Sequence, residues 1–414
     1  MRVFLISVLM LTANLLLGQN ELYYHVPQVQ TLRAYVANDE RSIPIITLGS
    51  EDRVVVEFDY MGANIPDLEY TIQHCDRNGR PSDLQPSEYM NGFVTNLLTD
   101  YSVSVATTQS YTHFGICLPN DDVELLLSGC YVLTVTQAGT NYVIARTAFF
   151  VCEQLTTIEL SVRKPQLTAD SRHMHDVALS VDIGGLPIGN IFDELNIGLL
   201  QNGCPYSAVI DMKPRQIAGT KLVYSYFGDL LMAGGNEFRR LDLRYLRQTP
   251  ANYNRVDFDG SFFHVSPATD ESRAFKPYFT DEDQNGQFII YANSPTRTTD
   301  FFRSADYVYV HPTLASEPVL DGDVFVCGAF NGWQLDSTNL MRYNFEQQRY
   351  ESDLLLKQGV YDYIYVCRNS YTAQVDMERF EGSHSETANS YLVMVFFKPA
   401  NADYEQLVGV LVSE

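Results

Sequence analysis

Short segments in which apolar and polar residues alternate recur along the whole chain, and this feature constrains the fold more than any other. Alternation with a period of two is typical of β-strands that bury one face. Segments of this kind occupy residues 68–72, 131–135, 158–162, 241–245 and 307–310, and turn-forming Gly, Asn, Asp and Pro clusters separate them. The pattern predicts an all-β protein made of tandem immunoglobulin-like β-sandwich domains.

Two polar joints divide the alternating segments into groups. One joint covers residues 152–157, and the other covers residues 311–318, where Pro312 and Pro318 flank a short polar stretch. The chain has 414 residues, which at about 100–200 residues per domain allows several domains. We therefore predict three sandwiches, over residues 19–155, 156–312 and 313–414.

The N-terminus predicts export. Arg2 precedes an apolar run from Val3 to Leu17, which Gly18 follows, and this order is typical of a secretory signal peptide over residues 1–18. An uncleaved anchor is the alternative, but the run is short for a helix that spans a bilayer. No later segment has the roughly 18 apolar residues that a spanning helix needs, so we expect an exported protein that does not itself span a membrane.

The charge balance narrows the class of partner. The formal net charge is −23, which disfavours nucleic acid and anionic lipid surfaces as ligands. An acidic surface is compatible with a basic protein partner or with cations, and it also keeps a chain soluble. We expect no nucleic-acid partner.

The seven cysteines lack a C-x-x-C pair, so their spacing indicates no zinc site. Export would permit disulfides, although an odd count leaves at least one thiol out. Cys327 with Cys367, and Cys117 with Cys130, are the plausible pairs.

Two histidine-containing segments could carry chemistry. His74-Cys75-Asp76, with His113 elsewhere, could supply a thiol and a base, but neighbours in a strand face opposite sides, so a polar strand end is the favoured interpretation. In the segment His173-x-His175-Asp176, the two histidines would share one face of a strand and could share a metal. No third ligand is identifiable by spacing, so we predict no metal there.

An acidic segment matches the first half of a calcium loop. Asp281, Asp283 and Asn285 alternate before Gly286, but the position of the bidentate glutamate of an EF-hand holds Ala292. An acidic hairpin turn is the favoured interpretation.

A second charged segment, from Gly235 to Asp242, favours an ion pair over catalysis. G-x-S-x-G, G-x-G-x-x-G, P-loop and H-E-x-x-H motifs are all missing from the sequence. The sequence therefore predicts no enzymatic activity, no cofactor and no metal.

The last predicted domain carries a motif of its own. Gly328-x-Phe330-Asn331-x-Trp333, followed by Gly359-x-Tyr361-x-Tyr363, resembles the glycogen-binding early-set immunoglobulin-like domain. The resemblance implies a sugar-stacking platform, for which Trp333 and Tyr371 are the candidates, although Ile364 occupies the expected lysine position. Bracing of the sandwich by Phe330 and Trp333 is the favoured interpretation.

A longer series of motifs resembles the type IX secretion system plug protein family, and it runs in family order along the mature chain. The pieces include His74-Cys75-Asp76, Glu88-Tyr89-x-x-Gly92-Phe93, Asp100-Tyr101-x-x-Ser104, Leu118-Pro119-Asn120, Gln201-Asn202-Gly203, Gly235-Asn236-Glu237-Phe238-Arg239 and Glu381-Gly382-Ser383.

The resemblance implies a periplasmic protein of Bacteroidota that binds the outer-membrane translocon barrel and plugs its periplasmic opening. A periplasmic or surface glycan-binding protein that uses the last domain is the alternative function. The sequence does not indicate which surface would contact the partner.

Overall fold

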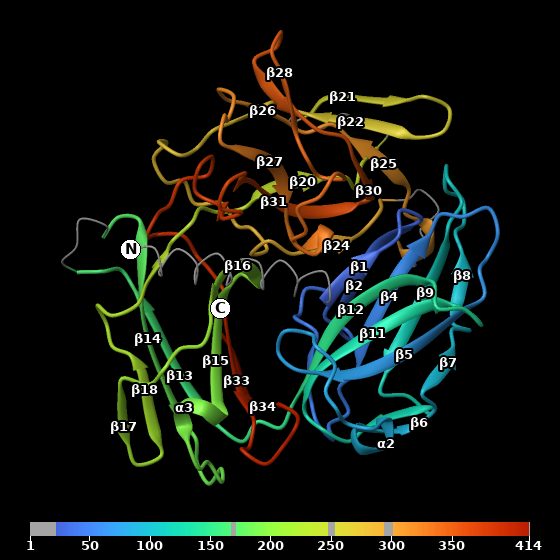
Figure 1. Ribbon diagram of the computed structural model, residues 1–414. Coiled ribbons are helices and arrows are strands. Elements are labelled where there is room, and N and C mark those ends of the chain that lie inside the picture. Colours follow the sequence, from blue (N-terminus) through green and yellow to red (C-terminus); the bar gives the residue numbers. More distant parts are fainter. Residues whose placement is uncertain (1–21, 167–170, 247–252, 294–300, 414) are drawn as a thin grey trace.

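The computed structural model describes residues 22–166, 171–246, 253–293 and 301–413. These residues form three β-sandwiches, each around an apolar core (Figure 1). The prediction of an all-β protein built from sandwiches is therefore confirmed. The expected signal peptide, residues 1–18, lies outside the described residues. In the described part of the chain, no helix has both the length and the apolar character to cross a membrane.

The first sandwich packs two sheets of N-terminal strands face to face. Alternation decides which side chains they bury: in β5, for example, Leu68, Tyr70 and Ile72 face the core. One sheet contains β1 (Tyr23–His25), β3 (Ile45–Thr47), β5 (Leu68–Cys75), β7 (Thr95–Leu97), β11 (Gly129–Gln137) and β12 (Val143–Cys152), and the other contains β2 (Val29–Val36), β4 (Val54–Tyr60), β8 (Tyr101–Val103) and β9 (Thr112–Leu118). At one end lie α2 (Pro86–Tyr89), β6 (Met90–Gly92) and β10 (Val123–Leu125).

The middle sandwich is completed by the C-terminal strands of the chain. Its first sheet contains β15 (Leu195–Gln201), β16 (Cys204–Val209), β33 (Tyr391–Phe397) and β34 (Gln406–Ser413), with α3 (Ile191–Glu194) before β15. Facing it are β13 (Thr157–Arg163), β14 (Met174–Asp182), β17 (Gln216–Ala218), β18 (Lys221–Ser225) and β19 (Leu231–Ala233). A single parallel pair, Cys152 with Leu407, joins β12 to β34, so one ten-stranded sheet runs through both sandwiches.

The third sandwich is organised around β31 (Gly359–Asn369), whose two halves have different neighbours. The first half lies between β20 (Arg239–Asp242) and β24 (Phe288–Ile290), and the second half pairs with β27 (Gly322–Cys327) and β32 (Val375–Asp376). The remaining strands are β21 (Tyr253–Phe258), β22 (Phe263–Pro267), β25 (Tyr307–Val310) and β30 (Leu354–Lys357) in one sheet, and β23 (Asp270–Glu271), β26 (Thr313–Ala315), β28 (Arg342–Asn344) and β29 (Arg349–Glu351) in another. Two short helices accompany them, α4 (Phe301–Ser304) and η1 (Ala329–Asn331).

Strand pairing crosses the boundary that the sequence placed between residues 312 and 313. Strands β20 and β24 precede it and pair with β31, whereas β33 and β34 follow it and pair within the middle sandwich. In Figure 1 the red C-terminal strands accordingly lie beside the green β15. Pro312 and Pro318 therefore punctuate the interior of one sandwich, because alternation identifies strands without identifying their partners.

One predicted strand is shorter than expected. The alternation over residues 241–245 continues past Asp242, where β20 ends. The Asp242 carboxylate accepts hydrogen bonds from the backbone N of Arg244 (3.1 Å) and from its guanidinium, and this local contact turns the chain.

Candidate partner-binding site

Six large apolar side chains are exposed together along one edge of the first sandwich. We call this set the apolar strip; its members are Phe93, Val94, Leu97, Tyr101, Val103 and Val105. Phe93 is 68 % exposed and Leu97 is 67 % exposed. Contiguous apolar surface of this kind on a folded protein commonly marks an interaction site.

Leu97, Tyr101 and Val103 of the strip lie on two edge strands, and the other three members lie just before or after these strands. Strand β7 ends the large sheet beside β5, and β8 ends the opposing sheet beside β9, and both lie at the outer side of this sandwich in Figure 1. Among the described residues, no strand pairs with the outer edge of either. The N of Leu98 donates to Leu68 O (2.9 Å), so alternation points the N–H of Leu97 away from β5. Unpaired edge groups of this kind can accept another strand.

The usual direction of alternation is inverted in and after β8. Tyr101, Val103 and Val105 face outward, whereas Ser102 and Ser104 are less exposed. Asp100 is the one charged residue between positions 93 and 105. An edge strand normally carries charge to prevent association, so this edge lacks the usual protection.

Gly92 fixes the direction in which the chain enters the strip. Its φ is +120°, and a Cβ placed on it would lie 1.8 Å from Asp122 O. The neighbouring Phe93 N donates to the same carbonyl at 3.3 Å. Only glycine fits this close approach, which leaves the Phe93 side chain on the outside.

The other end of the strip is attached to the third sandwich. Val105 N donates to Arg303 O (2.8 Å), and Thr108 N donates to Asp306 Oδ1 (2.6 Å). Tyr111 OH lies 2.9 Å from Ala305 O, which accepts its hydrogen bond. The strip is therefore held in a fixed position relative to two sandwiches.

A buried ion pair, which we call the junction pair, fixes the same interface. Lys357 Nζ from β30 lies 2.5 Å from Asp59 Oδ2 from β4, and both side chains are 1 % exposed. The same carboxylate accepts a hydrogen bond from Tyr307 OH (2.6 Å) and lies 2.8 Å from His113 Nδ1. Burial alone would raise the pKa of Asp59, but the charge of Lys357 and the His113 contact outweigh it, so this pKa lies below its usual range.

A second buried pair adjoins the first. Arg33 lies 2.5 Å from Glu57, and Tyr35 OH donates to Glu57 Oε2 (3.0 Å). The Arg33 guanidinium also lies over Phe288 and Phe302 of the third sandwich, at 5.6 and 5.4 Å from the ring centroids. Both pairs place charge where two sandwiches meet.

A cavity of about 930 Å³ lies where the three sandwiches meet. Its wall is mainly apolar, with Phe150 from the first sandwich, Phe396 from the middle one and Phe288 from the third. Five charged residues line it; Arg33 is paired with Glu40 (3.0 Å) and Arg77 with Asp211 (3.2 Å), and the fifth is Arg80. The lining therefore does not select a chemical class of ligand.

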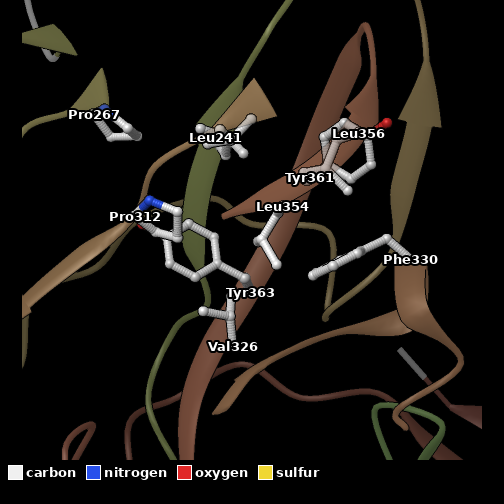
Figure 2. Close-up of a pocket in the computed structure, with 10 residues that line it drawn as sticks. Leu241, Pro267, Pro312, Val326, Phe330, Leu354, Leu356, Tyr361 and Tyr363 are labelled. Carbon is white, nitrogen blue, oxygen red and sulfur yellow. The ribbon is translucent and has the colours of Figure 1, made fainter. Parts of the chain in front are cut away.

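A much smaller cavity, of about 10 Å³, lies inside the third sandwich and has room for about one water molecule. Figure 2 shows apolar side chains from β20, β27, β30 and β31 converging on it, with Phe330 at its edge. Phe330 also packs edge-on against Tyr361, with ring centroids 5.7 Å apart. This space is a packing feature of the core.

The expected sugar platform does not form. Trp333 is 6 % exposed and packs edge-on against Phe238, whereas Tyr371 is 82 % exposed. Tyr206 OH donates to Trp333 O (2.7 Å), which ties the motif to β16 of the middle sandwich. Trp333 thus braces the interface with the middle sandwich, and the two rings do not share a surface on which a sugar could stack.

Neither expected disulfide forms in the described residues. Cys327 faces Ile364 and Cys367 faces Val324 across β27 and β31, so the thiols are three positions apart along the pair. Cys117 and Cys130 lie on opposing sheets and point away from the shared core, because their neighbours Ile116 and Tyr131 occupy it. Cys130 faces Cys75 instead.

The histidine segments are engaged in packing contacts. His74 is buried, with Nδ1 3.1 Å from Ser82 Oγ and Nε2 3.2 Å from Ser128 O. His173 Nδ1 lies 2.7 Å from Ser383 O, and His175 Nδ1 lies 2.6 Å from Tyr391 OH, so the two rings have separate partners. Within the described residues, no group of three or more His, Cys, Asp or Glu side chains is placed to hold a metal ion.

The charged segments form an ion pair and a turn. Arg239 Nε lies 2.9 Å from Glu381, and its guanidinium lies 2.7 Å from Asp270. Residues 284–287 form a tight turn in which Asn285 and Gly286 have positive φ, so the predicted turn is present. The strand after it, β24, pairs with β31 and not with a strand before the turn, so the predicted hairpin does not form.

The sequence indicated neither the apolar strip nor the junction pair. The inverted alternation from Tyr101 to Val105 is a local signal that could have marked the strip. Asp59 and Lys357 are 298 positions apart, and nothing local links them.

Residues 29–153 match the family model "Type 9 secretion system plug protein 1st domain". The crystal structure of a hypothetical protein from Parabacteroides merdae is 31 % identical, covers 95 % of this chain and 98 % of that chain, and superposes with a TM-score of 0.90. A C-terminal domain of the Streptococcus pyogenes antigen I/II-family protein AspA is 6 % identical over 93 % of this chain and 99 % of that chain, but its TM-score of 0.16 supports no argument. No curated protein matches the chain.

Proposed function

The chain belongs to the type IX secretion system plug protein family, and on that premise we propose that it is a non-enzymatic periplasmic subunit that binds the outer-membrane translocon barrel and closes its periplasmic opening. Family membership itself gives the chain a role related to type IX secretion and an association with the cell envelope. The barrel, the opening and the periplasmic location are the finer parts of the proposal.

The position of the apolar strip is the strongest support for the proposal. The whole apolar strip, residues 93–105, lies inside the segment that matches the plug family. It combines exposed apolar side chains with two unpaired strand edges, and a β-rich partner could use both. The junction pair fixes the first sandwich to the third, which suits a part that must block an opening.

Site-specific cross-linking in intact cells tests this contact. A photoreactive residue at position 97 should give a cross-linked product of very large mass in the outer-membrane fraction. The same residue at position 345 is the matched control, because Phe345 is 77 % exposed on the hairpin after β28 and lies in the third sandwich. Equal products from both positions, or none from position 97, would contradict the proposal.

Leakage through the outer membrane tests the closing role separately. Cells that lack the protein should admit mid-sized solutes that intact cells exclude, and the wild-type gene should restore the barrier. A gene that carries Phe93→Ser and Leu97→Ser should restore less of it than one that carries Phe345→Ser. Unchanged permeability after deletion would contradict plugging even where cross-linking succeeds.

A further inference from the structure

Several buried polar atoms gather at the turn before β24, and they have no partner among the described residues. They are Oδ1 of Asp362, Oδ1 of Asn285, and both Oε1 and Nε2 of Gln284. Seven such side-chain atoms occur in the described residues, and four of them are here. A buried polar atom without a partner costs free energy. Three of these four atoms are oxygens, which could bind a cation, whereas Nε2 of Gln284 is an N–H donor.

Asp362 lies against the turn from a different part of the chain. It belongs to β31 and is 0 % exposed. Its Oδ2 accepts hydrogen bonds from the backbone N of Gln284 and, at 3.4 Å, from that of Gly286. Because both carboxylate oxygens are bonded to one carbon, the unpartnered Oδ1 lies at the same turn.

The surroundings leave this carboxylate without a close cation. A second carboxylate, that of Asp283, also lies at the turn. Its Oδ1 accepts a hydrogen bond from the backbone N of Asn285 (2.9 Å), and its Oδ2 accepts one from the backbone N of Phe238. Arg240 is the partner of Asp362 across β20 and β31, but its side chain is exposed and forms no ion pair within the described part of the chain.

We propose that Asp362, Asn285 and Gln284 form a binding site for Ca²⁺ at this turn. Ca²⁺ takes carboxylate and amide oxygens together in flexible geometry, whereas Mg²⁺ keeps several waters and demands an octahedral arrangement. Two of these three ligands are amide oxygens. The site is therefore not among the groups of His, Cys, Asp and Glu side chains considered above as metal sites. Asp362 supplies the carboxylate of the site from β31.

Thermal unfolding tests the site on the purified mature protein. After treatment with EDTA, the protein should melt at a higher temperature when Ca²⁺ is added, since an ion that binds the folded state stabilises it. Calorimetric titration should give one ion per chain. No change in melting temperature up to about 5 mM Ca²⁺, which covers the affinity of extracellular sites, would overturn the proposal.

Three variants locate the ion. Asp362→Asn and Asn285→Gly should each lose most of the Ca²⁺-dependent shift; the second keeps the backbone, because Asn285 already has a φ of +52° that glycine adopts readily. Asp281→Asn, at an exposed position of the same segment, is the matched control and should keep the shift. Retention of the shift in the first two variants, or its loss in the control, would overturn the assignment. These measurements do not depend on the translocon, so they fail or succeed independently of the proposed function.

Discussion

The apolar strip and the junction pair depart from the ordinary distribution of side chains in opposite directions. The strip exposes six large apolar residues on strand edges, whereas the junction pair hides an aspartate and a lysine, each 1 % exposed, between two sandwiches. Buried charges must be paired, and their geometry is then fixed by short contacts. Exposed apolar groups need no partner for folding, so they remain available to another molecule.

The difference separates two tasks within one chain. Changes at the junction pair should affect stability, because they leave a charge uncompensated in the interior. Changes at the strip should affect binding and leave stability almost unchanged. The predictions below test this separation.

The largest effect is expected from Lys357→Met. Loss of the ammonium leaves Asp59 buried without its main counter-charge, and the free energy of unfolding should fall by about 3–5 kcal/mol. Denaturation by urea measures it. Lys276→Met is the control, because Lys276 pairs with Glu271 on the surface at 2.6 Å and should lose at most about 1 kcal/mol. The double variant Asp59→Asn with Lys357→Met should be more stable than Lys357→Met alone. Equal losses of stability in Lys357→Met and Lys276→Met would contradict the role of the junction pair.

The second-largest effect is expected in how the stability of the protein depends on pH, through the same Asp59–Lys357 pair. The pKa of Asp59 is lower in the folded state than in the unfolded chain, so its stabilisation is complete above the ordinary carboxylate pKa of about 4 and disappears as the pH falls further. Urea midpoints measured from pH 6 down to pH 3 should fall more steeply for the wild type than for Asp59→Asn. Parallel curves would show that the carboxylate is not held in its charged form by Lys357.

At the strip, the double change Phe93→Ser with Leu97→Ser should weaken capture of the partner by about tenfold or more. The lost apolar contact area accounts for this effect. The free energy of unfolding should change by no more than about 0.5 kcal/mol, because both side chains are exposed. Co-purification from outer-membrane extracts and urea denaturation provide the two measurements. A loss of stability similar to that of Lys357→Met would remove the distinction between the two regions.

The smallest effect is expected in the difference in partner binding between Leu97→Pro and Leu97→Ser. Proline removes a backbone N–H that points away from β5, so the pairing of β7 within the sheet should survive. If the partner adds a strand to this edge, the proline variant should bind more weakly than the serine variant. Equal binding would indicate that side-chain contact alone carries the interaction.

Much of the fold could be predicted from particular segments. The strands at residues 68–72, 131–135 and 307–310 lie within β5, β11 and β25, because alternation reports burial directly. The turn at Asn285-Gly286 followed from local chemistry as well, although it does not join a hairpin. The platform of Trp333 with Tyr371 and the two cysteine pairs could not be assessed in this way, because each depends on how distant strands are placed.

The sequence by itself determined the strands, the turns and the motifs of the plug family, since these depend on neighbours a few residues apart. Tertiary structure alone decided which strands pair, and it carried β33 and β34 back to the middle sandwich. It also placed Lys357 on Asp59 and Asp362 on the Asn285 turn, which are contacts between segments tens to hundreds of positions apart. The physical reason is that the period of a strand specifies which face is buried, whereas its partner is selected by the packing of the whole molecule.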